Sequence, residues 1–133
     1  MTDDTVFALI VEDQPDSAEI VARILAFNGR SYQSVASAEE ALVILSVLHP
    51  QIIIADLALP QMSGWDLLGE VKTIPSLANI PMVAVTAYHS PNVERGAMEV
   101  GFDAFLPKPL DTATFMQTVD DVIEETSRKS NQL

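Results

Sequence analysis

Short apolar runs alternate along this chain with longer segments of helical period, and four of the runs end on polar residues. This alternation is typical of a parallel β-sheet covered by helices, because each parallel strand needs a long crossover to reach the next. We therefore expect one open α/β sheet of five strand and helix pairs. The four runs are residues 7–11 before Glu12 and Asp13, 51–55 before Asp56, 82–85 before Thr86, and 104–107 before Lys108.

Local signals place the ends of the remaining elements. The first strand lies near residues 6–11, and the more polar segment 31–35 fits a short edge strand. Expected helices start near Pro15 or Asp16, at a capping box of Ser37 and Glu40, near Trp65, at Pro91, and after Asp111. The second should run to about Leu48. The fourth, the weakest, should run from Pro91 to Val100, with Gly101 as its stop, and residues 127–133 look like a frayed polar tail.

Composition limits the cellular setting and the partners. The 133 residues fit one domain, and none is cysteine, which indicates a reducing compartment. The acidic start of the chain is unlike a signal peptide, and the apolar runs are too short to cross a bilayer, so we expect a cytoplasmic protein. The net charge of −12 argues against direct binding of nucleic acid.

Polar groups that follow parallel strands meet at the carboxyl edge of the sheet, where such sheets bind ligands. Glu12, Asp13 and Asp56 would crowd their carboxylates there, which favours a divalent cation with oxygen ligands such as Mg²⁺. Each acid taken alone is as well explained by a helix cap or by exposure to water. The metal site is therefore a hypothesis that depends on all three acids meeting.

The same edge would hold a nucleophile and a cation. Asp56 can accept a phosphoryl group covalently if a metal and a nearby cation neutralise the developing charge. Lys108 supplies that cation, and its bond to Pro109 could be cis. Thr86 could donate a hydrogen bond to a phosphoryl oxygen. Judged singly, Lys108 fits a solvated surface residue and Thr86 an ordinary strand end.

The remaining aromatic and imidazole side chains carry weaker signals. Phe105 and Trp65 are better explained by core packing than by function. His49 and His89 have no metal-ligand spacing to each other, and we expect both on the surface.

Taken together, these residues resemble the receiver domain of two-component response regulators, the chemotaxis-regulator type. The resemblance covers about residues 5–126 and implies a flavodoxin-like sheet with strand order 2-1-3-4-5. Glu12 stands where many receivers have a second aspartate, and Phe105 where a tyrosine is often found. The matching motifs are Glu12-Asp13, Asp56, Leu59-Pro60 with Gly64, Thr86-Ala87 and Lys108-Pro109.

The resemblance also implies residue roles. Asp56 would be phosphorylated, with Mg²⁺, or alternatively Mn²⁺, held by Asp13, Asp56 and the backbone carbonyl of Ala58, and by Glu12 through water. Thr86 and Lys108 would contact the phosphoryl group, and Phe105 would respond by turning inward. The residues implied to tune the lifetime of the phosphoryl group are Ala58 and Tyr88, and the bulk of Tyr88 suggests that it screens the site from water.

We therefore expect a phosphoacceptor switch rather than a general enzyme. Its donor would be a sensor histidine kinase or a histidine phosphotransfer protein, and its output a contact with another protein. We expect no membrane partner, and a monomer or a weak dimer. Two alternatives remain: a receiver cut from a larger hybrid kinase or transcription factor, and an aspartyl phosphatase of haloacid-dehalogenase type, which is disfavoured because Ala58 stands where those enzymes carry a second acid.

Overall fold

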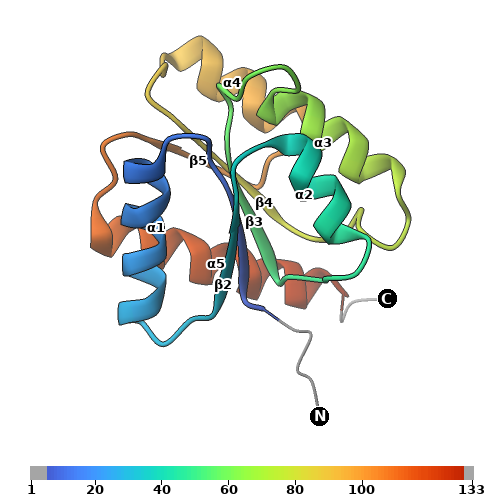
Figure 1. Cartoon of the computed structure of the whole chain (residues 1–133), viewed down its shortest axis with the longest axis horizontal. Helices are drawn as coiled ribbons and strands as arrows, with labels where there is room; N and C mark the ends of the chain where they lie inside the picture. Colours follow the sequence, from blue (N-terminus) through green and yellow to red (C-terminus); the bar gives the residue numbers. More distant parts are fainter. Residues whose placement is uncertain (1–5, 131–133) are drawn as a thin grey trace.

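The computed structural model describes residues 6–130. Its centre is a parallel five-stranded sheet in the order β2-β1-β3-β4-β5, which confirms the predicted topology (Figure 1). In the register, Ile10 of β1 lies between Ser34 of β2 and Ile54 of β3, so the strands end at a common edge. The strands are β1 (Ala8–Val11), β2 (Tyr32–Val35), β3 (Ile52–Asp56), β4 (Met82–Thr86) and β5 (Ala104–Pro107).

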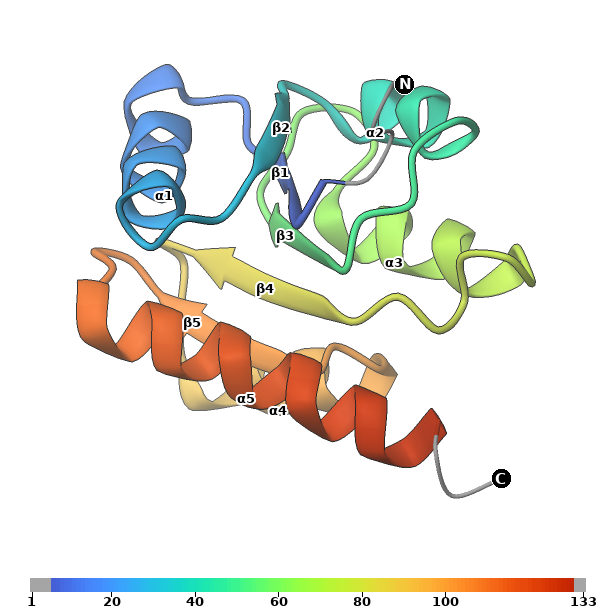
Figure 2. The same cartoon turned by 90° about the horizontal axis from the view of Figure 1, so that it is seen from below.

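Five helices cover the two faces of this sheet. One apolar cluster joins α1 and α5 to the sheet, and a second joins α2, α3 and Ala97 of α4 to the opposite face (Figures 1 and 2). Every residue of β3 is buried, as expected of its run of isoleucines, whereas most of β2 is exposed, as expected of an edge. The helices are α1 (Pro15–Phe27), α2 (Ala38–Leu45), α3 (Gly64–Thr73), α4 (Pro91–Val100) and α5 (Thr112–Ser130).

The caps of α2 and α3 differ from those that the sequence predicted. Ser37 caps α2 by accepting the Glu40 N–H, but the Glu40 carboxylate accepts from the Ala36 N–H, so the reciprocal box is incomplete. α2 also ends at Leu45 rather than near Leu48. The complete capping box belongs to α3, where Ser63 and Asp66 satisfy each other's backbone donors. The Ser-x-x-Asp spacing was the signal that the sequence analysis missed.

The predicted tail was also wrong over residues 127–130, because α5 continues to Ser130. Two ion pairs support this last stretch, and each joins residues one helical turn apart. They are Glu124 with Arg128 and Glu125 with Lys129. Positive charge near a carboxyl-terminal end also suits the helix dipole. Residues 131–133 lie outside the described part of the chain. No helix within residues 6–130 is long and apolar enough to cross a membrane.

Candidate functional site

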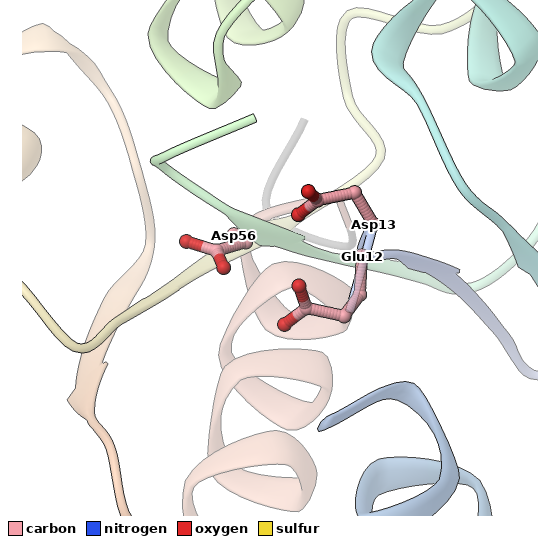
Figure 3. Close-up of side chains that lie close together, drawn as sticks. All are labelled: Glu12, Asp13 and Asp56. Carbon is pink, nitrogen blue, oxygen red and sulfur yellow. The ribbon is translucent and has the colours of Figure 1, made fainter. Parts of the chain in front are cut away.

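Three acids meet at the carboxyl edge of the sheet, as the sequence predicted. Glu12 and Asp13 follow β1, and Asp56 is the last residue of the neighbouring strand β3. One carboxylate oxygen from each residue lies within 4.8 Å of the other two (Figure 3). Oxygen donors this close repel one another unless a cation lies among them, so the donor set fits a hard divalent ion.

Asp56 is held in a fixed orientation. The residue is 6% exposed, and Oδ1 accepts a hydrogen bond of 2.9 Å from the Ala58 N–H. Oδ2 lies 3.0 Å from the Lys108 ammonium. The hydrogen bond from the Ala58 N–H closes a short turn directly after β3, so the backbone that follows the strand orients the carboxylate.

Glu12 is almost as buried as Asp56. It is 7% exposed, Oε2 accepts from the Gln14 N–H at 3.1 Å, and Oε1 lies 2.5 Å from the Lys108 nitrogen. Burial raises the pKa of the Glu12 carboxyl, with the nearby Asp56 charge adding to this effect, and the hydrogen bond from Lys108 opposes it. The sequence placed Lys108 beside Asp56 but gave no sign that it also pairs with Glu12.

Lys108 joins the two sides of the site. Burial alone lowers the pKa of its ammonium, but the hydrogen bonds to Glu12 and Asp56 outweigh burial and raise the pKa overall. Its backbone N–H donates to the Thr86 carbonyl at 2.9 Å, which ties the end of β5 to the end of β4. The peptide bond from Lys108 to Pro109 is cis, the isomer that the flanking prolines suggested.

Thr86 ends β4 and is almost fully buried. Its hydroxyl oxygen accepts a hydrogen bond from the Tyr88 N–H at 3.1 Å, so the side chain is oriented by the loop that follows. Tyr88 itself is 77% exposed, so in this conformation its ring is not packed as a screen over the acids. Phe105 is half-buried against the apolar cluster of α2 and α3.

The other sequence assignments to packing and surface also hold. Trp65 packs edge-on against Phe102, with ring centroids 6.0 Å apart, and both histidines are exposed.

Gly64 has a role that the motif match did not explain. A Cβ added at Gly64 would lie 2.4 Å from the Asp56 carbonyl oxygen and 2.9 Å from the Leu57 Cα. The start of α3 therefore touches the backbone that carries Asp56, and only glycine permits this approach.

A family model described as the response regulator receiver domain matches residues 8–120. This chain belongs to that family. It is therefore a receiver domain of two-component signalling, with the sheet order and helical layers that the resemblance implied.

Individual relatives agree with the family match. The chain is 32% identical over 111 residues to the "uncharacterized 14.6 kDa protein in sodA1 3′ region" of Leptolyngbya boryana, covering 84% of this chain and 85% of that protein. It is 29% identical to the polar-differentiation response regulator DivK of Brucella ovis, covering 84% and 90%. The signal receiver domain of a histidine kinase from Syntrophus aciditrophicus is 32% identical, with a TM-score of 0.82 and coverage of 90% and 91%.

Proposed function

We propose that this receiver domain is a magnesium-dependent phosphoacceptor whose nucleophile is Asp56. An Asp56 oxygen attacks the phosphorus of a phosphohistidine on a sensor kinase or phosphotransfer protein. An O–P bond forms, the N–P bond breaks, and the released imidazole nitrogen keeps the electron pair and takes a proton from solvent. The proposal depends on one observation: Asp56 lies within reach of two further carboxylates and of the Lys108 ammonium.

The side chains around Asp56 divide the work of the transfer. The Ala58 N–H holds Oδ1, which leaves Oδ2, now paired with Lys108, as the oxygen placed to attack. Once the phosphoryl group is attached, Lys108 turns its charge to the phosphoryl oxygens, and the Thr86 hydroxyl donates to one of them. The metal, when bound, neutralises the negative charge that accumulates between the carboxylates and the phosphoryl group.

We assign the metal site to Asp13, Asp56 and the backbone carbonyl of Ala58, with Glu12 acting through a water molecule. The proximity of the three carboxylates supports this assignment, and the Lys108 contact favours an outer role for Glu12. Mg²⁺ suits such a site because it keeps several waters and binds carboxylate and phosphoryl oxygens, and Mn²⁺ would fit the same donors.

The output would be a conformational change read by a protein partner. We infer that movement of Thr86 toward the phosphoryl group pulls the loop through Tyr88, while Phe105 turns inward beside it. The hydrogen bond from the Tyr88 N–H to the Thr86 hydroxyl supports this coupling, because movement of Thr86 must either break this bond or draw the Tyr88 backbone along. We place the reaction in the cytoplasm and expect no direct contact with nucleic acid.

Labelling with a small phosphodonor tests the nucleophile. The purified chain, incubated with acetyl phosphate and Mg²⁺, should gain the mass of one phosphoryl group, and chelation of the metal should prevent this. Asp56→Asn should abolish labelling, whereas Asp121→Asn, which changes an exposed acid on α5 outside the site, serves as the matched control. Full labelling of Asp56→Asn would refute the assignment.

Metal binding is tested separately by calorimetric titration with Mg²⁺. Asp13→Ala should weaken binding more than Glu12→Ala, because only Asp13 is assigned as a direct ligand. Equal affinity in wild type and Asp13→Ala would contradict the ligand set without touching the assignment of Asp56.

The alternative of a receiver within a larger protein is favoured by one comparison, because a receiver domain of a histidine kinase is 32% identical to this chain. The site chemistry would be the same in that setting. A coding sequence that continues past Leu133 would decide for it. The phosphatase alternative predicts steady turnover of a generic phosphate ester, which the phosphoacceptor proposal does not.

A further inference from the structure

The loop that follows β3, residues 57–63, contains one strained backbone position. Gln61 has a φ of 63°, and within residues 6–130 it is the only residue other than glycine with a positive φ. A Cβ makes this left-handed conformation costly, so the conformation persists where the surrounding structure holds it. Because the loop starts directly after Asp56, the contacts that hold Gln61 also hold the backbone beside the site.

A side chain from α2 reaches this strained position. Glu39 lies in the first turn of α2, and its Oε2 accepts a hydrogen bond of 3.4 Å from the Met62 N–H. The peptide group that this bond holds is the one that joins Gln61 to Met62. The bond is longer than most, but a charged acceptor binds an N–H more strongly than a neutral one does. Glu39 therefore restrains the backbone at the point where the loop is strained.

The ends of the loop are held in other ways. The Leu57 N–H donates to the Val85 carbonyl at 3.1 Å, and the Gly64 N–H donates to the Leu57 carbonyl at 3.1 Å. In the described chain, the bond to Glu39 is the only hydrogen bond that ties residues 59–62 to another element. Glu39 is exposed, and no described lysine or arginine forms an ion pair with it. Its contact with the loop is thus its one bond outside α2.

We propose that Glu39 is a positioning residue for the site at the carboxyl edge of the sheet. By holding the peptide group after Gln61, it keeps the loop in the conformation in which the Ala58 N–H reaches Asp56 Oδ1. The role of Glu39 rests on the proposed function, in which the Ala58 carbonyl is a ligand of the metal. A loop that is fixed before the metal arrives needs less ordering when the metal binds, so the affinity is higher.

Calorimetric titration of the full chain with Mg²⁺ tests this role. Glu39→Ala removes the acceptor and should lower the Mg²⁺ affinity by about tenfold, the smaller end of the range for groups that orient metal ligands. Glu39→Gln keeps a side-chain oxygen within reach of the Met62 N–H and should bind Mg²⁺ nearly as tightly as wild type. Glu70→Ala removes an exposed carboxylate from α3 and serves as the matched control, with unchanged affinity.

The glutamine variant separates the hydrogen bond from the charge. The negative charge of Glu39 attracts a cation and also suits the amino-terminal end of the α2 dipole, and both effects are lost in Glu39→Gln as well as in Glu39→Ala. Equal weakening of Mg²⁺ binding by the two variants would therefore assign the effect to charge and would overturn the positioning role.

Glycine at the strained position gives a rescue experiment. Gln61→Gly adopts a φ of 63° without the cost of a Cβ, so the loop needs less restraint from α2. The double variant Glu39→Ala with Gln61→Gly should therefore recover part of the Mg²⁺ affinity that Glu39→Ala loses. A double variant that binds no better than Glu39→Ala would overturn the proposal, because the strain at Gln61 is what Glu39 is proposed to hold.

Hydrogen exchange follows the same bond without metal. The Met62 amide should exchange faster in Glu39→Ala than in wild type or Glu39→Gln, while the Leu57 amide, which is bonded to β4, should not change. Equal exchange at Met62 in all three proteins would overturn the proposal. A wild type that does not bind Mg²⁺ would refute the proposed function and this role together, whereas full Mg²⁺ affinity in Glu39→Ala would refute the positioning role alone.

Discussion

The loop after β3 and the loop after β4 both carry site residues, but the structure holds them very differently. The first loop is packed: Leu57 and Leu59 are buried beside Asp56, the last residue of β3, the Leu57 N–H donates to the Val85 carbonyl at 3.1 Å, and Gly64 touches the backbone from the start of α3. In the second loop, residues 87–90 are all exposed, and the α4 helix that follows buries only Ala97.

This difference matches two requirements of a switch. A nucleophile must be held in a fixed position, because small displacements of a reacting group are costly to the rate. An element that reports a chemical change must have two arrangements of similar free energy, and such elements come from the weakly packed parts of a structure. The packed loop after β3 is therefore suited to hold the proposed nucleophile, and the exposed loop after β4 is suited to the response that we propose.

Two glycines test the comparison most strongly. Gly64→Ala places a methyl group 2.4 Å from the Asp56 carbonyl oxygen, so we expect a loss of about 3 kcal/mol of stability and of phosphoryl labelling. Gly96→Ala, within α4, meets only the tip of Trp65 at 3.8 Å and should gain about 0.5–1 kcal/mol from helix propensity. Urea denaturation and labelling of both variants measure this, and equal effects would contradict the contrast between the loops.

Lys108 contacts Asp56 through its side chain and the Thr86 carbonyl through its backbone N–H, so removing the side chain should break only the contact with the packed side. Lys108→Ala leaves Glu12 and Asp56 without their cation and should destabilise the metal-free protein by about 2 kcal/mol. Added Mg²⁺ should recover much of this loss and should bind at least as tightly as to wild type, since a competing positive charge is gone. Nuclear magnetic resonance shifts at Phe105 should no longer follow phosphorylation. A normal Phe105 response would count against the connection.

The buried carboxyl of Glu12 predicts that the stability of the metal-free protein depends on pH. Its folded-state pKa is raised above the ordinary 4.5, so the folded protein binds that proton more tightly than the unfolded chain does. Without metal, the contribution of Glu12 favours folding at low pH and is lost as the pH rises through the raised pKa. As the pH rises through this pKa, wild type should therefore lose stability relative to Glu12→Gln. A difference that does not vary with pH would refute the assignment.

Tyr88, on the exposed loop, should give the smallest effect. Since Tyr88 is 77% exposed, Tyr88→Ala should change stability by no more than about 0.5 kcal/mol. If the ring covers the phosphorylated site after the loop moves, the lifetime of the phosphoaspartate should shorten in the variant. Decay of the purified phosphoprotein in Mg²⁺ measures this, with His89→Ala as the matched control. An unchanged lifetime would show that Tyr88 does not guard the site.

Much of the site could be read from strand ends. Glu12, Asp56, Thr86 and Lys108 each follow an apolar run, and a parallel sheet must bring such ends together. The position of Trp65 and the exposure of both histidines also followed from local pattern. The end of α5 did not, because ion pairs on its exposed face extend the helix past its last apolar residues.

The sequence by itself determined the alternation of strands and helices, the edge position of β2 and the set of groups at the carboxyl edge, because these depend on local periodicity and chain direction. Only the tertiary structure decided that Lys108 pairs with Glu12 as well as Asp56, and that Gly64 lies against the backbone of Asp56. Lys108 is 96 positions from Glu12 and 52 positions from Asp56 along the chain. Only packing in three dimensions brings residues so distant in sequence into contact. The exposed ring of Tyr88 was decided in the same way, by which neighbours the fold left within its reach.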